Sequence, residues 1–431
     1  MVGAPALAQQ TMDTSSRGGD AVRVFLDCQN VQCDFNFFRT EITFVDWVRD
    51  RQDSDIHLLV TSQRTGSGGE EYTLTFAGRN RFTGSDQILK FVSNPTATDD
   101  ERRKGLANIF KLGLARYAAS TPMAGRLKLT YDAPTSKDSA KKAARDPWNY
   151  WVFRTRLNGN LNGESRSSRQ NYYGNISANR TTEQWKVRLS SNGSYGKSQY
   201  VFRSVLIDAS GDTLINADTT RNYSYSYGSN ALMVKSLGEH WSAGADASVN
   251  SATYSNQKLS VQVGPAIEYD LFPYSQSTRR QLTFRYGINA NRFLYRDTTL
   301  FGRIRENRWD HYLLVSLDAK QKWGSISLSA SGNQYFFDLS KNSLNLFGDG
   351  EFRIYKGLSA NFFGSYSLVS NQLSLAKTEV SPLQTILGLR EIETSYRYFT
   401  YFGLSYTFGS IFNNVVNPRF EGSSGGFFFS N

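Results

Sequence analysis

Apolar and polar residues alternate one by one through most of the chain from residue 148 to about residue 412. A period of two is the period of a β-strand, whose successive side chains point to opposite faces. In residues 394–408 one such face carries Tyr396, Tyr398, Phe402, Leu404, Tyr406 and Phe408. The other face carries Arg397, Gly403, Ser405 and Thr407. The alternation therefore predicts strands over the C-terminal two-thirds of the chain.

The polar positions of these strands repeatedly hold full charges and small residues. A soluble β-sandwich also alternates, but it buries the apolar faces of its two sheets in one shared core. An apolar face with aromatic ends, set against an ionic face, is typical of strands with lipid on one side and water on the other. We therefore expect a mainly β protein that contains an antiparallel transmembrane β-barrel.

The predicted strands number about twelve, which is an even count. They lie at 148–162, 170–181, 184–197, 220–236, 240–254, 258–271, 280–296, 308–323, 325–337, 342–355, 358–370 and 394–409. Three connections are long, at 198–219, 297–307 and 371–393. The connections that alternate with them are short, at 182–183, 237–239, 324 and 356–357, except for 272–279, which is longer than the other short ones. Long loops on one side and short periplasmic turns on the other are typical of outer-membrane barrels. Both ends of the barrel are then periplasmic.

The N-terminal residues 20–133 have a different pattern, in which helical and strand periods follow one another. Strands are expected at 22–28, 56–62, 71–78, 87–92 and 126–132, and a helix at 35–49. Thr98 and Glu101 have the spacing of a capping box, so a second helix is expected to begin there and to run to about Ala119. This order predicts a small periplasmic α/β domain. Residues 134–147, rich in Ala, Lys and Ser, predict a linker to the barrel at 148–412.

The two ends of the chain carry short signals of their own. Ala6-Leu7-Ala8 fits a signal-peptide cleavage pattern, so residues 1–19 are interpreted as a signal-peptide remnant and flexible N-terminus. Residues 413–431 are expected to form a tail whose three phenylalanines, 427–429, either dock onto the protein or a partner or remain disordered.

Hydropathy and aromatic content agree with a barrel. Mean hydropathy is −0.47, and the chain has no apolar run of the length that a transmembrane helix requires. Barrel strands keep mean hydropathy low because only every second residue faces lipid. Aromatic residues make up 14% of the chain, and tryptophans lie near the ends of predicted strands. We expect these to lie at the membrane interfaces: Trp148, Trp151, Trp185, Trp241, Trp309 and Trp323.

Charge and cysteine content limit the partners and cofactors. The net charge of +11 is compatible with nucleic acid or with anionic lipid and lipopolysaccharide. The basic residues are scattered rather than gathered in one patch, so no nucleic-acid partner is expected. Cys28 and Cys33 lie five residues apart without further metal ligands nearby. We expect them to form a disulfide in an oxidising periplasm, and we expect no metal and no cofactor.

Charged residues on the polar faces of the strands are predicted to line the lumen. They are Arg154, Arg156, Lys186, Arg188, Asp246, Glu268, Asp270, Arg285, Asp318, Lys320 and Arg397. They could orient a charged solute in a narrow channel, or pair across strands and fill the lumen. Eight-stranded barrels are filled by side chains and sixteen-stranded ones are open, so twelve strands leave both alternatives, with a closed or very narrow pore favoured.

Histidines offer little for catalysis. His57 begins a predicted strand, His240 lies by a predicted periplasmic turn, and His311 lies near the outer side beside Asp310. Neighbouring residues of a strand point to opposite faces, so Asp310 and His311 cannot pair directly. We therefore expect the protein not to be an enzyme and assign no catalytic residue.

Two resemblances extend this picture. The last strand reads SYTFGS and is followed by NNVVNPRF, and in this the C-terminal two-thirds resembles outer-membrane barrel proteins of Gram-negative bacteria. Alternating aromatics that end near Phe408 resemble the signal recognised by the barrel-assembly machinery, although about twenty residues follow. The element order of residues 20–133 loosely resembles the periplasmic α/β domains of curli-secretion and Tol-type envelope proteins. These resemblances imply an outer-membrane location but bring no activity with them.

Three functions follow from these patterns. The first is a membrane anchor in an envelope complex, with a periplasmic protein partner bound through residues 20–133, because a simple porin needs no such domain. The alternative is a narrow pore or translocation channel for small solutes. A third reading, an outer-membrane enzyme, would require activity through His311.

Overall fold

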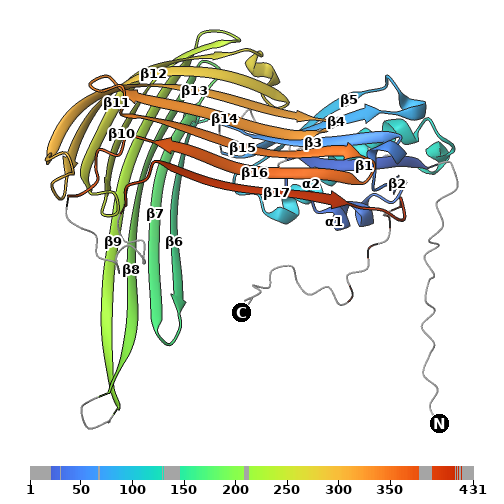
Figure 1. Ribbon diagram of the computed structural model, residues 1–431. Helices are drawn as coiled ribbons and strands as arrows, with labels where there is room; N and C mark the ends of the chain where they lie inside the picture. Colours follow the sequence, from blue (N-terminus) through green and yellow to red (C-terminus); the bar gives the residue numbers. More distant parts are fainter. Residues whose placement is uncertain are drawn as a thin grey trace.

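The computed structural model contains a small α/β domain and a large antiparallel sheet (Figure 1). It describes residues 21–29, 31–66, 68–128, 130, 146–207, 213–377, 391–412, 414, 416 and 419. The predicted signal remnant, most of the predicted linker and the phenylalanines at 427–429 lie outside the described residues.

The N-terminal domain is built on a five-stranded sheet in the order β2-β1-β3-β4-β5. Its elements are β1 (Val22–Gln29), α1 (Phe35–Glu41), β2 (Val45–Trp47), β3 (Ile56–Arg64), β4 (Glu70–Gly78), β5 (Gln87–Ser93) and α2 (Asp99–Ala118). β1 runs parallel to β2 and β3, whereas β3, β4 and β5 are antiparallel. The strands predicted at 22–28, 56–62, 71–78 and 87–92 are confirmed.

The helices cover one face of this sheet and form the hydrophobic core with it. Phe76, Phe110 and Leu114 are fully buried there. The predicted capping box is confirmed, because Glu101 N–H donates to Thr98 Oγ1 at 3.2 Å and Thr98 N–H donates to Glu101 Oε2 at 2.7 Å. The disulfide between Cys28 and Cys33 is also confirmed, and it joins the end of β1 to the loop before α1.

Two elements of the domain differ from the predictions. The helix expected over 35–49 ends at Glu41, and Val45–Trp47 pairs with β1 instead, which places Val45 and Trp47 in the core. The strand expected over 126–132 is wrong, since Pro122–Arg126 is a 3₁₀ turn and residues 127, 128 and 130 have no regular structure. Alternation produces a strand only where a partner edge is present, and these three residues pair with no strand in the described chain.

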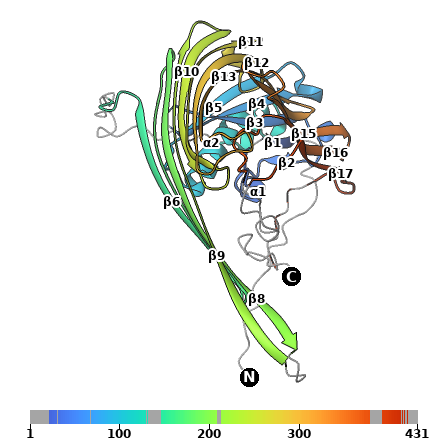
Figure 2. The same ribbon diagram turned by 60° about the vertical axis from the view of Figure 1, so that its left-hand side comes forward.

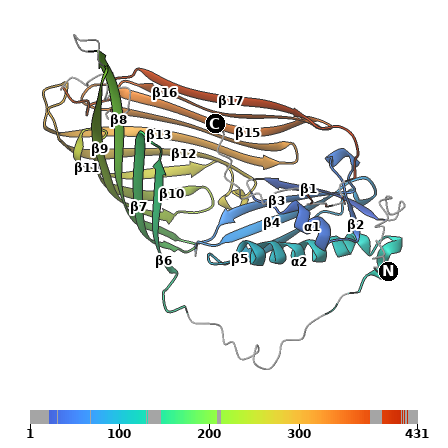
Figure 3. The same cartoon turned by 90° about the horizontal axis from the view of Figure 1, so that it is seen from below.

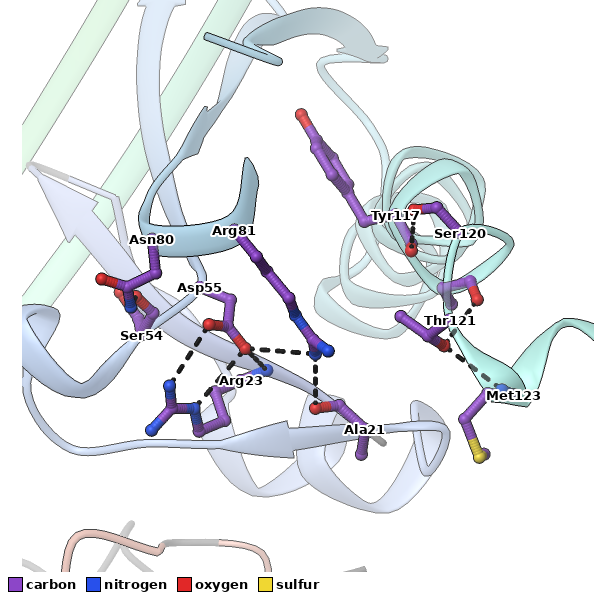
Figure 4. Close-up of polar contacts among 11 residues, drawn as sticks. Ala21, Arg23, Ser54, Asp55, Asn80, Arg81, Tyr117, Ser120, Thr121 and Met123 are labelled. Atoms are coloured by element: carbon purple, nitrogen blue, oxygen red, sulfur yellow. Dashed lines mark hydrogen bonds and ion pairs between the residues drawn. The ribbon is translucent and has the colours of Figure 1, made fainter. Parts of the chain in front are cut away.

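A buried carboxylate secures the start of β3 (Figure 4). Asp55, at the residue before this strand, is almost fully buried and forms ion pairs with Arg23 and Arg81, each at 3.3 Å. Arg81 also donates to the carbonyl of Ala21 at 3.1 Å. These contacts join β1, β3 and the turn after β4, so the cluster has a structural role.

The second part is a sheet of twelve strands, and the predicted antiparallel order is confirmed. The strands are β6 (Trp151–Gly163), β7 (Ser167–Thr181), β8 (Trp185–Ile207), β9 (Thr213–Ser236), β10 (Trp241–Ala252), β11 (Gln257–Asp270), β12 (Arg280–Tyr295), β13 (Arg305–Gln321), β14 (Gly324–Tyr335), β15 (Asn342–Tyr355), β16 (Leu358–Val369) and β17 (Tyr396–Tyr406). Each strand pairs with its neighbour in the sequence.

One connection is much shorter than predicted. Residues 198–219 were expected to form a long loop, but β8 and β9 remain paired as far as Ile207 and Thr213. Alternating β-branched and aromatic residues such as Val201 and Phe202 favour this extension. The hairpin projects beyond the rest of the sheet (Figures 1 and 2).

The sheet is strongly curved, and its two outermost strands are β6 and β17 (Figure 2). Within the described residues, β6 pairs only with β7 and β17 pairs only with β16. The twelve-stranded sheet is thus confirmed, whereas its closure into a cylinder stays a prediction.

Register divides the large sheet into two faces of different chemistry. On the outer face, aromatic and aliphatic side chains are highly exposed, among them Leu157 at 82%, Phe402 at 80% and Leu404 at 76%. The inner face, which carries Arg154, Glu268 and Arg353, is mostly polar. No helix among the described residues is long and apolar enough to cross a membrane.

Candidate functional site: the charged inner face and the docked domain

The inner face carries continuous rows of polar side chains across neighbouring strands. Because directly paired residues share a face, the pairing places Arg154 in one row with Ser177, Ser190, Asn230, Ser248, Gln262 and Asn291. Seven strands thus contribute a polar residue at the same level of the sheet. Such a surface is suited to water or polar solutes.

Four of the predicted lumen charges meet around one cavity on the inner face, which we name the β8–β12 cavity. Lys186, Asp246, Glu268 and Arg285 line it, and its volume is about 270 Å³. Arg285 Nη2 lies 2.5 Å from Glu268 Oε2, so these two side chains form an ion pair. The structure thus brings together charges from β8, β10, β11 and β12.

A second cavity lies between the inner face and the N-terminal domain, and we name it the β12–β15 cavity. It has a volume of about 420 Å³ and is lined by Asp318 and Lys320 of β13 together with Ser62 and Gln63 of β3. Ser327 donates to Asp318 at 2.7 Å. The domain therefore forms one wall of a polar cavity inside the curved sheet.

The remaining predicted lumen charges are not gathered in one place. Arg156, Arg188 and Arg397 are exposed, and register places them on the inner face. Asp270 is instead fully buried, where one carboxylate oxygen accepts from the backbone N–H groups of Phe272 and Leu282, each at 3.1 Å. Asp270 therefore fixes the connection between β11 and β12. Arg397 and Arg154 would be neighbours on one basic stretch of the lumen only if β17 met β6. This arrangement stays a prediction.

The N-terminal domain lies against the concave side of the large sheet, with its own sheet between α2 and the large strands (Figure 3). The turn between β3 and β4 reaches β6 and β7: Arg154 donates to the carbonyl of Gly68 at 3.4 Å, and a Cβ on Gly66 would lie 2.7 Å from the Thr181 Cβ. Only glycine therefore fits at position 66 without displacement of β7.

The centre of this interface is a buried group that we name the Asp27 cluster: Asp27, His57, Gln29 and Arg353. The Asp27 side chain is fully buried, and Arg353 of β15 binds its two oxygens at 2.5 and 2.6 Å. His57 Nε2 lies 2.8 Å from Asp27 Oδ2, and Gln29 donates to the same oxygen at 3.3 Å. Gln29 also donates to the carbonyl of Gln321 at 2.8 Å.

The Asp27 cluster was missed by the sequence analysis, which noted His57 only as the start of a strand. Arg353 and Asp27 are 326 residues apart, so no local pattern joins them. One signal was present: Asp27 directly follows the apolar run Val24–Leu26, and His57 lies within the otherwise apolar run Ile56–Val60. A polar pair within buried strands indicates a partner, because a buried charge needs one.

Burial and pairing act in opposite directions on the pKa values of this cluster. Burial alone would raise the pKa of Asp27, but hydrogen bonds from His57 and Arg353 and the charge of Arg353 outweigh it and hold the pKa below its ordinary 3.8. Burial lowers the pKa of His57 below 6.5, and the hydrogen bond to Asp27 does not restore it. We therefore infer a neutral His57 that donates from Nε2 to a charged Asp27.

Acid should weaken the folded state through this cluster. Both folded-state pKa values are depressed, so the unfolded chain binds more protons, and the stabilisation is complete only above the unfolded pKa of each group. We expect the thermal midpoint to fall as the pH decreases below about 6.5, through His57, and again below about 3.8, through Asp27. His57→Gln should remove the first decrease; thermal scans in detergent that show it unchanged would exclude His57 as the source.

Further acidic groups of the domain meet the turn between β15 and β16. Lys356 forms an ion pair with Asp53 at 2.7 Å, and Gly357 N–H donates to Asp50 at 2.9 Å. Arg51 donates to the carbonyl of Lys322 in the turn between β13 and β14. The domain is therefore joined to two adjacent turns of the large sheet, both of them predicted to be periplasmic.

The segment after β17 returns to the domain and pairs with its outermost strand. Arg49 N–H donates to the carbonyl of Ile411 at 2.9 Å, and Val48 forms an antiparallel bridge with Phe412. Asn414 accepts from Trp47 N–H at 2.6 Å and donates to Asp46 at 2.9 Å. Residues 411, 412 and 414 therefore contact the edge of the small sheet at β2.

The far end of the inner face is covered by part of the connection between β16 and β17. Leu373 packs with Phe293, Tyr295 and Tyr335 in a buried cluster. Leu300 N–H donates to the carbonyl of Leu375 at 2.8 Å. The inner face of the large sheet is thus covered at both ends. The N-terminal domain covers one end, and this loop covers the other.

The inner face also contains an aromatic group that the sequence analysis omitted. Phe347, Phe363 and Phe399 lie side by side on β15–β17, with ring centroids 5.5 and 5.8 Å apart. Their positions interrupt the polar side of the alternation: Phe399 has the same parity as Arg397. The polar side of these strands is therefore not uniformly ionic.

The structure places the neighbours Asp310 and His311 on opposite faces of the sheet, as parity predicts. Asp310 is buried on the inner face and accepts from Asn289 and Asn291 at 2.8 and 2.5 Å. His311 lies on the outer face, stacked on Phe336. His240 contacts the carbonyl of Asp270. No group of three potential metal ligands occurs among the described residues.

The six tryptophans singled out in the sequence differ in exposure. Trp148, Trp241, Trp309 and Trp323 are exposed, whereas Trp151 and Trp185 are partly covered. Trp323 stacks on Phe352, and Trp185 lies under the Lys235 ammonium group. Their placement at membrane interfaces stays a prediction.

Comparison with known proteins gives little further information. No protein-family model and no curated protein matches the chain. A solved structure of the NanC porin is similar to this chain, with 10% sequence identity, 59% of this chain and 99% of that chain covered, and a TM-score of 0.28. A likeness of this size is too weak to assign a function.

Proposed function

We propose that the protein is an outer-membrane channel for small charged solutes, whose periplasmic mouth is occupied by its own N-terminal domain. The observation that carries this proposal is the contrast between the two faces of the large sheet. Exposed apolar patches above a few hundred Å² are rare on soluble monomers. The outer face here presents Leu157, Val263, Leu313, Phe402 and many similar side chains, which favours contact with lipid.

The inner face supports the channel part of the proposal. Ionic side chains that surround a water-filled path select solutes by charge, and the β8–β12 and β12–β15 cavities carry such side chains. The turn between β3 and β4 and the residues near Leu373 narrow the path. We therefore expect low conductance while the domain is docked.

Single-channel recording in planar bilayers tests this proposal. The unmodified protein should give small, infrequent openings, and Arg353→Met, which removes the partner of Asp27, should raise the open probability at least about tenfold, since about 1.4 kcal/mol of lost docking free energy suffices. Lys356→Met is the matched control, because its ion pair with Asp53 is more exposed. Absence of openings from both variants and the unmodified protein would overturn the channel proposal.

A second candidate function, an anchor in an envelope complex, is favoured by the free edge of the N-terminal domain. β5 has no partner beyond β4 among the described strands, and its Ile88 and Val92 are exposed at 52% and 56%. A protein strand could pair with this edge. A photo-crosslinker at position 88 should then give one discrete adduct in intact cells, and one at the equally exposed Leu112 of α2 should not.

Both candidate functions include a location in the outer membrane, with lipid and lipopolysaccharide against the outer face of the large sheet. They also include the barrel-assembly machinery as a transient partner. Both place the N-terminal domain and the segment after β17 in the periplasm. The short turns between β13 and β14 and between β15 and β16, which contact the domain, support this orientation, because periplasmic turns are short in outer-membrane barrels.

A further inference from the structure

We infer that the β8–β12 cavity binds a small zwitterionic solute, which carries one carboxylate and one ammonium group. This inference deepens the proposed channel function, since it names the class of solute. It starts from the four charges that line the cavity: two positive, on Lys186 and Arg285, and two negative, on Asp246 and Glu268.

Two of these four charges are already satisfied by each other. Glu268 accepts from Arg285 Nε at 2.8 Å and from the Tyr274 hydroxyl at 3.1 Å, in addition to its ion pair with Arg285 Nη2. Ser242 donates to the Tyr274 oxygen at 3.2 Å, which holds this ring in place. Glu268 and Arg285 therefore form a fixed, neutral part of the wall.

The other two charges, on Lys186 and Asp246, face the same cavity without a partner. Neither side chain has a hydrogen bond or ion pair within the part of the chain that the structure describes. Both are partly buried. Withdrawing a charge from water without a partner costs free energy. A ligand that brings a negative charge to Lys186 and a positive charge to Asp246 would offset this cost.

Register places these two opposite charges on strands that are not neighbours. Lys186 lies opposite Val234, and Asp246 lies opposite Leu232 on the other side of the same strand, β9. Strands two apart are separated by about 10 Å, and positions two residues apart by about 7 Å. The two backbone positions are therefore about 12 Å apart, and the two side chains form no ion pair with each other. An extended molecule with a charge at each end can contact both.

The dimensions of the cavity limit the solute further. A volume of about 270 Å³ lies just below the range of about 300–1,000 Å³ that is usual for drug-sized ligands. Gly244 and Ala266 present little side-chain volume between the charged residues. The cavity therefore fits an aliphatic ω-amino acid or a molecule of similar length.

Isothermal titration calorimetry of the full chain in detergent tests this inference with ε-aminocaproate as the probe. Caproate and hexylammonium are matched probes that each lack one charge. The unmodified protein should bind ε-aminocaproate at least about tenfold more tightly than either, since each charged hydrogen bond changes affinity about ten- to a hundredfold. Lys186→Gln and Asp246→Asn should each remove this preference, whereas Lys320→Gln, in the β12–β15 cavity, should retain it.

Other results would overturn the inference in recognisable ways. Equal binding of caproate and ε-aminocaproate would indicate an anion site, and equal binding of hexylammonium would indicate a cation site. Binding that Lys186→Gln and Asp246→Asn leave unchanged would place the solute elsewhere. Calorimetry measures binding whether or not the protein conducts ions. Binding without conductance would therefore contradict only the channel proposal. Conductance without binding would contradict only the zwitterion site.

Discussion

Replacing Arg353 with methionine should release the N-terminal domain from the large sheet. Methionine keeps the length of the side chain but leaves the fully buried carboxylate of Asp27 without its cation. Removing one partner of a buried ion pair costs about 3–5 kcal/mol, because the remaining charge stays out of water. Hydrogen–deuterium exchange of the Arg49 and Gly357 amides, which donate across the interface, should therefore accelerate by about two to four orders of magnitude.

Two further variants show whether the lost pair is the cause. Asp27→Asn in the Arg353→Met background removes the unpaired charge, so it should restore most of the protection of the Arg49 and Gly357 amides, since loss of both partners is often nearly neutral. Lys356→Met should change exchange little, because exposed ion pairs contribute about 0–1 kcal/mol and its side chain is 39% exposed. Equal acceleration by Arg353→Met and Lys356→Met would show that docking does not depend on the Asp27 cluster.

An arginine on the outer face of the large sheet should impair folding into lipid. Val263 lies in the middle of β11 with a 52% exposed side chain on the outer face. An arginine on the lipid face of a barrel costs about 2–4 kcal/mol near the bilayer midplane. Val263→Arg should therefore lower the free energy of folding into vesicles by that amount, measured from the urea dependence of the folded fraction.

The neighbouring position supplies the control for this prediction. Gln262 lies in the same strand but on the inner face, beside Ser248 and Asn291. Gln262→Arg places the same charge among polar side chains and should change the folding free energy little. If the two substitutions cost the same, the faces of the sheet do not differ in their surroundings, and the membrane assignment fails.

The strands of the large sheet could be predicted from the sequence because their determinant is local. Alternation along one segment selects the strand and its faces, as in residues 394–408, whatever the rest of the chain does. The prediction was wrong where a local pattern competes with a partner. Val45 continues the helical spacing of Phe38 and Ile42, yet Val45–Trp47 pairs with β1. Residues 198–219 contain loop-forming residues, yet the two strands continue to pair.

The candidate site was predictable only in part, for the same physical reason. Glu268 and Arg285 could be placed on one polar face by parity, and the register then sets them directly opposite each other. Asp27 and His57 gave a sequence signal, but their partner Arg353 could not be predicted, because the contact depends on how the small domain lies against β15. Phe347, Phe363 and Phe399 were missed because one aromatic residue on a polar face is unremarkable until three strands bring their rings together.

The pairing of residues 411 and 412 with the end of β2 has a consequence for biogenesis. Val48 and Arg49 are synthesised before the strands of the large sheet, and their backbone partners follow the twelfth of these strands. The edge of the early-made sheet therefore stays incomplete until synthesis has passed every strand. The domain can therefore complete this edge only after the last strand has been made, so a chain truncated before β17 would keep an unpaired edge at β2.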